Sequence, residues 1–426
     1  MKSLVSLLLL SLWAVPAFSQ EFLAQVIPHP YIAHHNNSEN EVMQITSGMA
    51  ALQQRIEMIR RAKRRIEVEY FIYNTDLAGK IITRELVDAA RRGVKVRILI
   101  DKSKPIFEFG EAYAKALADQ GIEVRYYNKA PMVRVSTVQF RSHKKMISID
   151  DREAITGGRN IGDDYFDLSP KFNFNDTDIY VRGPIVKTMR EAFDKYFEHK
   201  ISERPVLPAE KSEKALSFLS ESKEETKTRE LLKRVGGKIL AETKLHVCPE
   251  TTFVTDAPGA NFFQRLNPKF DEKYKFIRKV LFDKLSRVEK SVLLSTPYLL
   301  ANKHSNALMK GLLKRNIDIT VYTNSLASTD AVYVAANLYY DVFKWTRKGI
   351  QIYLHDGLFV NNNPEVPEAS KKARWGTHSK VQVYENHNSS EAMIGTYNVD
   401  NRSNFYNSEM AIFCKGNDEF TQEVKS

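Results

Sequence analysis

The feature that most constrains this chain of 426 residues is an internal duplication built on the pattern His-x-Lys. Each copy has a histidine and a lysine two positions apart, then an acidic residue, then a glycine followed three positions later by an asparagine. The first copy comprises His143, Lys145, Asp150, Gly157, Gly158 and Asn160, and the second comprises His378, Lys380, Glu385, Gly395, Thr396 and Asn398. Such a duplication predicts two similar halves that close on each other and bring both motifs to one interface.

The segments around each motif repeat one order of helices and strands, in which helical spacing alternates with short apolar runs. In the first half we expect helices at 49–65 and 80–92 and strands at 66–73, 94–101 and 122–127. In the second half we expect helices at 274–288 and 306–314 and strands at 291–298, 317–323 and 350–354. This alternation favours an α/β fold. We therefore predict two pseudo-symmetric α/β sandwich halves, residues 43–203 and 270–426, each with a mixed β-sheet flanked by helices and with the active site between them.

Residues 204–269 separate the two halves and differ from them in composition. Two prolines open the segment, a run of Lys, Glu and Ser follows from 210 to 233, and glycine-containing pairs interrupt the remainder. The pattern indicates one of two structures. The first is a linker or insert with one or two helices, for which a flap over the site is one option. The second is a solvated linker without regular structure.

Both ends of the chain carry signals outside the repeat. Lys2 is followed by an apolar run from Leu4 to Ala17 and by a small-x-small sequence ending at Ser19, which is typical of a signal peptide over residues 1–19. A membrane anchor is the alternative, but the run is shorter than the ~20 apolar residues that span a bilayer. We expect export to the periplasm or the medium. The last helix of the first half has only a shortened counterpart in the second half, which begins at Asp418. Either the second half is naturally shorter there or the sequence is a fragment of a longer chain, and we favour the fragment.

Charge and cysteine content each leave alternatives open. The net charge of +11 predicts attraction to polyanions, either anionic lipid surfaces or nucleic acids, and a merely solvated basic surface is the third alternative. Cys248 and Cys414 are the two cysteines of the chain. They form a disulfide in an oxidising compartment or remain two buried thiols.

The motif residues fit the cleavage of a phosphodiester. Side chains at i and i+2 of a strand share a face, so His143 and Lys145 reach one spot, and His378 and Lys380 reach another. One histidine would act as the nucleophile and the other as the proton donor, and imidazole suits both roles because its ordinary pKa is ~6.5. The lysines and the two motif asparagines would hold the phosphate oxygens as negative charge develops on them.

Each histidine also needs a carboxylate on its other ring nitrogen to orient it. Asp178 and Glu409 occupy corresponding places in the repeat, about 30–35 residues after each histidine, and we predict that they orient His143 and His378. The glycine pair 157–158 would let the backbone approach a ligand closely. The mechanism requires no metal ion and no cofactor.

These residues resemble the signature of the phospholipase D superfamily, His-x-Lys-x4-Asp-x6-Gly-Ser-x-Asn in duplicate, over residues 43–426. The stretches 157–166 and 395–409 are most similar to the bacterial cardiolipin synthase-like branch. The resemblance implies phosphatidyl transfer or phospholipid hydrolysis through a phosphohistidine intermediate. It also implies that His143 is the nucleophile and His378 the acid, and that the partners are a phospholipid substrate and a membrane surface.

The chain departs from that signature at several positions. Gly158 and Thr396 replace its serine, so a hydroxyl contact is expected to be missing from the first half. Glu385 replaces the second aspartate, and three extra residues precede the next glycine. This acidic position lies in a turn away from the histidine, so we expect activity to survive. Lys144 adds charge beside His143 and favours an anionic headgroup.

Two other functions remain alternatives. A metal-independent nuclease of the same superfamily shares the chemistry and would use the basic charge, but the covalent repeat and the central insert favour a lipid substrate. A catalytically inactive protein that binds anionic lipids is disfavoured, because both histidines, both lysines and both asparagines are intact. We therefore predict a phospholipase D-type hydrolase or transferase without an obligate protein partner, with nucleic acid as the less favoured substrate.

Overall fold

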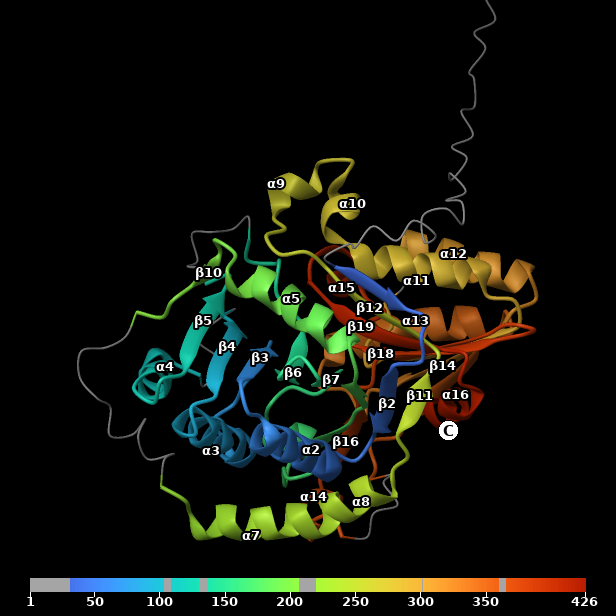
Figure 1. Ribbon diagram of the computed structural model, residues 1–426. Helices are drawn as coiled ribbons and strands as arrows, with labels where there is room; N and C mark the ends of the chain where they lie inside the picture. The colour runs from blue at the N-terminus through green and yellow to red at the C-terminus, as the bar shows by residue number, and fades with distance from the viewer. Residues whose placement is uncertain (1–30, 103–108, 130–136, 207–219, 301, 360–364) are drawn as a thin grey trace, which may run out of the picture.

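The computed structural model describes residues 31–102, 109–129, 137–206, 220–300, 302–359 and 365–426 (Figure 1). The expected signal peptide lies outside the described residues. Two large mixed β-sheets form the centre of the molecule, one in each half. The predicted fold class is therefore confirmed.

The first sheet has nine strands, and parallel pairing is confined to its β3, β4 and β5. Its order across the sheet is β10 (Ser202–Glu203), β5 (Glu123–Tyr127), β4 (Lys95–Asp101), β3 (Arg65–Tyr70), β6 (Lys145–Ile149), β7 (Glu153–Gly157), β9 (Asp178–Arg182), β2 (Asn40–Ile45) and β11 (His246–Cys248). The motif strand β6 and its hairpin partner β7 thus lie in the middle, flanked by buried neighbours on both sides.

The second sheet has eight strands and repeats this order from β5 onward. It runs β15 (Gln351–His355), β14 (Asp318–Asn324), β13 (Ser291–Ser295), β17 (Val381–Glu385), β18 (Ser390–Gly395), β19 (Met410–Lys415), β12 (Glu250–Thr255) and β1 (Ile32–His35). Its parallel pairs, β13 with β14 and β14 with β15, correspond to those of the first sheet. The expected pseudo-symmetry therefore holds strand by strand, with β17 and β18 in the places of β6 and β7.

Helices cover the outer face of each sheet, and two helices lie between the sheets. The first sheet is covered by α2 (Gly48–Arg61), α3 (Leu77–Arg91) and α4 (Glu111–Ala118), and the second by α11 (Phe276–Arg287), α12 (Lys303–Lys314) and α13 (Val332–Thr346). The inner helices are α5 (Ile185–Phe197) and α16 (Asp418–Lys425). Their apolar faces share one core with both sheets, in which Ile185 and Phe420 lie fully buried. The two halves are thus joined by a continuous hydrophobic core.

The end of α2 shows how a motif residue shapes the fold. Ser47 begins the helix by accepting a hydrogen bond from the backbone N–H of Ala50 at 3.3 Å. The helix was expected to reach residue 65 but stops at Arg61. The carboxylate of Asp150 accepts hydrogen bonds from the backbone N–H groups of residues 63, 64 and 65 at 2.8–2.9 Å. Those N–H groups therefore bond to the Asp150 carboxylate instead of to helix carbonyl groups. The chain leaves the helix at this point and enters β3.

The segment 204–269 contributes strands to both sheets, so the alternative of a linker without regular structure is wrong for the described residues. The helices expected of an insert are present. Strand β11 of the segment pairs with β2 of the first sheet, and its β12 pairs with β1 and β19 of the second. Ahead of these strands in the chain, α7 (Lys223–Leu231), the π-helical turn η3 (Leu232–Gly236) and α8 (Gly237–Glu242) pack on α2 and α3, where Leu232 and Val235 are buried. The N-terminal strand β1 likewise belongs to the second half. Strands of three to six residues carry too little periodicity to reveal such a crossing.

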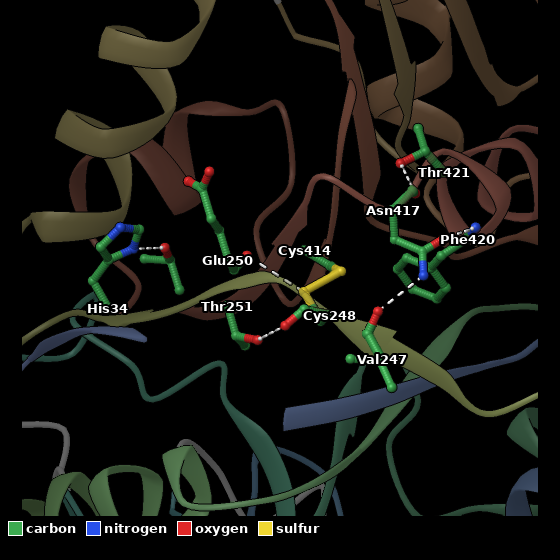
Figure 2. The surroundings of a disulfide bond; sticks show 10 residues. His34, Val247, Cys248, Glu250, Thr251, Cys414, Asn417, Phe420 and Thr421 are labelled. Atoms are coloured by element: carbon green, nitrogen blue, oxygen red, sulfur yellow. Dashed lines mark hydrogen bonds between the residues drawn. A yellow bond between two sulfur atoms is a disulfide. The ribbon is translucent and has the colours of Figure 1, made fainter. Parts of the chain in front are cut away.

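The two cysteines form a disulfide that joins the two sheets (Figure 2). Cys248 lies at the end of β11 in the first sheet, and Cys414 lies in β19 of the second. Their Cα atoms are 5.7 Å apart and 166 residues apart in sequence. A cross-link over so long a loop restricts the unfolded chain strongly, which by the loop-entropy account adds about 2–5 kcal/mol of stability.

Within the described ranges, every helix is too short or too polar to cross a lipid bilayer.

Candidate active site

Each motif histidine follows a segment that pairs in parallel with the other half. Ser142, just before His143, bridges to Ser408, and β16 (Arg374–Thr377), just before His378, pairs with β8 (Phe172–Asn175). The backbone N–H of His143 donates to Ser408 O at 2.9 Å, and that of His378 donates to Asn175 O at 2.7 Å. The two histidines are therefore held in equivalent positions by backbone contacts across the interface.

Each imidazole is oriented by a carboxylate from the opposite half. His143 Nδ1 lies 3.0 Å from Glu409 Oε2 and 3.1 Å from Thr396 O. His378 Nδ1 lies 2.6 Å from Asp176 Oδ2. Both rings are nearly inaccessible to solvent. Because the carboxylates are exchanged between halves, neither half by itself contains a complete histidine–carboxylate pair.

The prediction that Asp178 orients a histidine is wrong, and strand register explains why. Gly157 lies opposite Asp178 in the first sheet, whereas Gly395 lies opposite Ala411 in the second. The residue two places before Ala411 is Glu409, so its structural equivalent is Asp176. Sequence spacing did not distinguish Asp176 from Asp178.

Asp178 instead holds a buried ion cluster behind the site. Its Oδ2 lies 2.8 Å from Arg55 Nη1 and 3.4 Å from Arg159 Nη1, and all three side chains are inaccessible to solvent. Arg55 also donates to the hydroxyl of Tyr70 at the end of β3. The cluster therefore ties α2 to β3 and β9, the two strands that flank the motif hairpin of β6 and β7.

The two carboxylates differ in their surroundings. Glu409 accepts hydrogen bonds from Thr396 Oγ1 and from Ser403 Oγ, the latter at 2.7 Å. Burial works to raise the pKa of Glu409, but His143, Lys145 and Ser403 outweigh it and hold the pKa at about 2. Asp176 receives the adjacent Thr177 N–H at 2.7 Å, and its pKa is raised because burial outweighs the neighbouring cations. Glu409 is therefore the more firmly ionised partner.

The first half lacks the hydroxyl contact because there is no room for one. A Cβ atom on Gly158 would lie 2.0 Å from Asp176 Oδ1, well inside the closest approach of real side chains. The equivalent Thr396 has space for its side chain and donates to Glu409. The expectation of an asymmetric hydroxyl contact therefore agrees with the structure, and the shorter carboxylate side chain of Asp176 occupies the vacant place.

The two motif lysines are fully buried beside the histidines. Lys145 Nζ donates to His143 O at 2.6 Å, and Lys380 Nζ donates to His378 O at 2.5 Å and lies 2.9 Å from His378 Nδ1. Burial, joined by the charge of Lys380, lowers the pKa of Lys145 well below its usual value. Burial lowers the pKa of Lys380 to about 8. The repulsion between the two ammonium groups makes this a site that an anion would stabilise.

Both histidines are held in the neutral form. Burial lowers the pKa of His143 to about 4, against the attraction of Glu409 and with the help of Lys145. Burial and the two lysine charges lower the pKa of His378 well below its usual value. A neutral imidazole is a nucleophile, whereas the proton donor must be charged. A phosphate anion bound between the lysines would cancel the charge that keeps His378 deprotonated.

The motif asparagines are less symmetric than expected. Asn160 Oδ1 accepts from the backbone N–H of Ile72 at 3.2 Å, and its Nδ2 donates to the hydroxyl of Tyr165 at 2.9 Å. Asn398 is buried, and its Oδ1 has no hydrogen-bond partner among the described residues. Asn398 therefore has unused hydrogen-bonding capacity in the site, while the amide of Asn160 positions Tyr165.

The remaining motif residues shape the strands rather than the site. Asp150 binds the three N–H groups that precede β3, and Glu385 accepts from Ser291 Oγ and from Lys425 Nζ, the latter at 2.8 Å. Gly157 has φ +153°, and a Cβ there or on Gly395 would lie 2.4 Å from the next strand. Asp150 lies in the turn after β6, whereas Glu385 is the last residue of β17 rather than part of a turn. Both stand at the end of the motif strand that is farther from the histidine, as expected.

Lys144 does not face the site, so its predicted role at an anionic headgroup is wrong. It follows His143 directly and therefore points to the opposite face of the chain. Its Nζ lies 2.9 Å from Glu69 Oε1 and packs over the ring of Tyr196 in the buried layer between the sheets. Burial lowers its pKa to about 8.

Sequence reasoning missed the aromatic walls around both imidazoles. Phe71 lies edge-on to His143 with ring centroids 5.2 Å apart. Tyr165 and Phe174 contact His378 with centroids 5.4 Å and 4.9 Å away. The alternation Phe-Asn-Phe-Asn in β8 was the available signal for Phe174. These rings exclude water from the imidazoles and account for part of the loss of hydration that lowers their pKa values.

Over the described ranges, no group of three or more His, Cys, Asp or Glu side chains is arranged to hold a metal ion.

Comparison with known proteins agrees with this geometry. A family model described as "Cardiolipin synthase, PLD-like domain" matches residues 55–198 and 281–426. An uncharacterised protein of Helicobacter pylori is 27% identical over 92% of this chain and 79% of its own length. A cardiolipin synthase of Halalkalibacterium halodurans is 25% identical over 87% of this chain and 61% of its own length. The crystal structure of phosphatidylserine synthase from Haemophilus influenzae has the same fold, with 15% identity and a TM-score of 0.61 over 90% of this chain and 86% of that one. The chain therefore belongs to the cardiolipin synthase family of phospholipase D-like enzymes.

Proposed function

We propose that this protein transfers the phosphatidyl group of a phospholipid, through a covalent phosphohistidine, to an alcohol or to water. The observation that carries the proposal is the pair of exchanged histidine–carboxylate contacts, His143 with Glu409 and His378 with Asp176, around two buried lysines. The relatives support phosphatidyl transfer, since one of them is named cardiolipin synthase. The acceptor is an expectation from this likeness.

The geometry supports a two-step reaction. In the first step Nε2 of neutral His143 attacks phosphorus, a P–N bond forms, and the P–O bond to the leaving alcohol breaks as His378 gives that oxygen a proton. In the second step His378 takes a proton from the acceptor hydroxyl, whose oxygen attacks phosphorus and breaks the P–N bond. Lys145 and Lys380 hold the phosphate oxygens throughout. We assign the nucleophile to His143 because its partner Glu409 is the more firmly ionised carboxylate.

The test is product analysis with the purified protein on phosphatidylglycerol vesicles, with and without added glycerol. We expect phosphatidic acid or cardiolipin to form, and the product to vanish in His143→Gln and His378→Gln. The covalent intermediate can be trapped by denaturing the protein in detergent without acid after incubation with phospholipid labelled in its phosphate group. We expect the label to stay on the His378→Gln variant but not on His143→Gln. Label on the second variant alone would reverse the assigned roles.

The competing proposal is a nuclease, which the net charge of +11 favours. Plasmid DNA incubated with the protein in EDTA separates the two. Cleavage of DNA without turnover of lipid would replace the lipid proposal, and turnover of lipid alone would exclude the nuclease.

We further propose that the protein is exported and acts at a membrane surface. The N-terminal pattern of residues 1–19 and the cross-link between Cys248 and Cys414 support export, because disulfides persist in oxidising compartments. N-terminal sequencing of the protein recovered from a periplasmic or extracellular fraction tests this. A mature N-terminus at Gln20 is expected, and recovery of the intact chain from the cytoplasm would contradict it.

A further inference from the structure

A short helical hairpin on the second half carries an exposed apolar tip. It consists of α9 (Phe262–Arg265) and α10 (Phe270–Tyr274), which project from the top of the molecule in Figure 1. The side chains of Phe262, Phe263 and Leu266 are 49%, 71% and 71% exposed. Exposing three large apolar side chains on one projection is unfavourable in water, since a buried Phe or Leu gains about 1.5–3 kcal/mol. Clustered exposure of this kind marks a surface that contacts something else.

The base of the tip is positively charged. Lys269 and Lys273 are exposed on the same hairpin, and Arg265 contacts Phe405 and Tyr406. Of the acidic residues nearby, Asp271 is engaged in an ion pair with Arg278, which leaves Glu272 as the exposed anion. The hairpin therefore exposes large apolar side chains together with a net positive charge, a combination that suits an anionic lipid headgroup layer.

The hairpin is rigidly joined to the segments that lead into the active site. Arg265 donates to the hydroxyl of Tyr406 and stacks over its ring. Phe140 contacts both Tyr406 and Phe270, with ring centroids 5.5 Å and 6.3 Å away. Phe140 precedes His143 by three residues, and Tyr406 precedes Glu409 by three. The tip is thus fixed in position relative to the first histidine–carboxylate pair.

A hollow of about 1100 Å³ lies beside the hairpin, between it, α11 and α12. Its apolar lining includes Phe270, Phe276, Val280, Leu308 and Phe405. A convex tip of three apolar residues is too small for a stable protein interface, which takes about 20 residues a side. A lipid surface, in contrast, accepts a small apolar wedge and supplies chains that fit a hollow next to it.

We propose that the α9–α10 hairpin is the membrane-docking element of this protein, and that Phe262, Phe263 and Leu266 enter the interfacial layer of an anionic bilayer. Only the reason for docking rests on the proposed function: a docked protein would have its active site close to the phosphodiester groups of the lipid headgroups. Docking itself is independent of turnover. The bound surface is held by apolar burial at the tip and by Lys269 and Lys273 at the headgroups.

The first test measures binding of the whole protein to sedimented vesicles of phosphatidylglycerol and phosphatidylcholine in equal parts. The variant Phe262→Ser/Phe263→Ser/Leu266→Ser should lower the partition coefficient roughly tenfold or more. The matched control Phe343→Ser/Tyr353→Ser/Leu358→Ser removes three apolar residues of similar exposure far along the chain and should bind as the wild type does. Equal binding of both variants would overturn the proposal.

The second test does not depend on any loss of binding. In Phe263→Trp the introduced indole should be quenched by vesicles whose acyl chains carry bromine, and in Phe343→Trp it should not. The native Trp345 and Trp375 are buried, so their background is constant. Trp13 belongs to the expected signal peptide, so both variants are made in the protein without residues 1–19. An indole at position 263 that bromolipid leaves unquenched contradicts docking.

Turnover separates this proposal from the proposed function. If the function and the docking both hold, the tip variant loses activity on vesicles but keeps it on short-chain lipid dispersed below its aggregation limit. If the wild type turns over no lipid yet the tip variant loses binding, docking stands and the lipid enzyme does not. If activity is present and the tip variant binds and works normally on vesicles, the docking proposal fails alone.

Discussion

His378 of the second half and Asp176 of the first half form a direct contact of 2.6 Å between Nδ1 and Oδ2, both almost completely buried. The contact crosses the interface between the two sheets. It makes the orientation of one motif histidine dependent on the docking of the opposite half, and the same dependence applies to His143 through Glu409.

Asp176→Asn should lower kcat by about 10²–10⁴-fold with little change in folding, because the imidazole loses the charge that fixes its tautomer. Asp178→Asn is the matched control. It disturbs the buried contact with Arg55, so its main effect should be on stability, at about 3–5 kcal/mol. Steady-state rates and thermal unfolding of both variants check this. The assignment of Asp176 fails if Asp178→Asn, once folded, is the slower enzyme.

Gly158→Ser should lower activity even though it restores the residue usual in the superfamily. The added Cβ would lie 2.0 Å from Asp176 Oδ1, so the carboxylate must move away from His378. A displacement near 1 Å can cost about 10²-fold in rate. Gly158→Ala should behave alike because the clash comes from Cβ, and Thr396→Ser should stay near wild type because its hydroxyl is kept. Full activity in Gly158→Ser would refute this account.

Stability should fall as pH decreases from about 6.5 to about 4, in part through His143. The unfolded histidine takes up a proton below its usual pKa of ~6.5, but the buried ring does so only near pH 4. Between these values protons favour the unfolded chain, at a cost of about 3 kcal/mol from His143 by pH 4. Urea unfolding of His143→Gln should show a shallower pH dependence, whereas His387→Gln, at an exposed position, should keep the wild-type slope. Parallel slopes in wild type and His143→Gln would contradict the lowered pKa.

Inorganic phosphate should raise the melting temperature by relieving the repulsion between Lys145 and Lys380. At 100 times the dissociation constant the gain is about 2.7 kcal/mol. Lys145→Met should abolish the phosphate response. Lys144→Met removes a neighbouring buried lysine that is paired with Glu69, so this variant should be less stable yet still respond to phosphate. An unchanged response in Lys145→Met would mean that phosphate binds elsewhere.

Much of the architecture could be predicted from periodicity. The strands at residues 94–101 and 317–323 and the helices at 80–92 and 306–314 appear as β4, β14, α3 and α12 with bounds shifted by three residues or fewer. What could not be predicted is the crossing of short strands between sheets. β1 lies before the first half in sequence yet pairs in the second sheet, and β11 lies in the segment between the halves yet pairs in the first. Such short strands form because they hydrogen-bond to the exposed edge of an existing sheet, and the residues of that edge are distant in sequence.

The sequence by itself determined which residue types meet at the site, because the duplication placed a histidine, a lysine and an asparagine at the same position of each half. The tertiary structure alone decided which carboxylate serves His378. Asp176 and Asp178 are two residues apart and both precede or begin β9, so spacing and strand period treat them alike. The pairing of Gly157 with Asp178 and of β8 with β16 distinguishes them, and it turns Asp178 to Arg55 and Asp176 to the imidazole. That choice depends on the register between strands far apart in the chain, which no local pattern encodes.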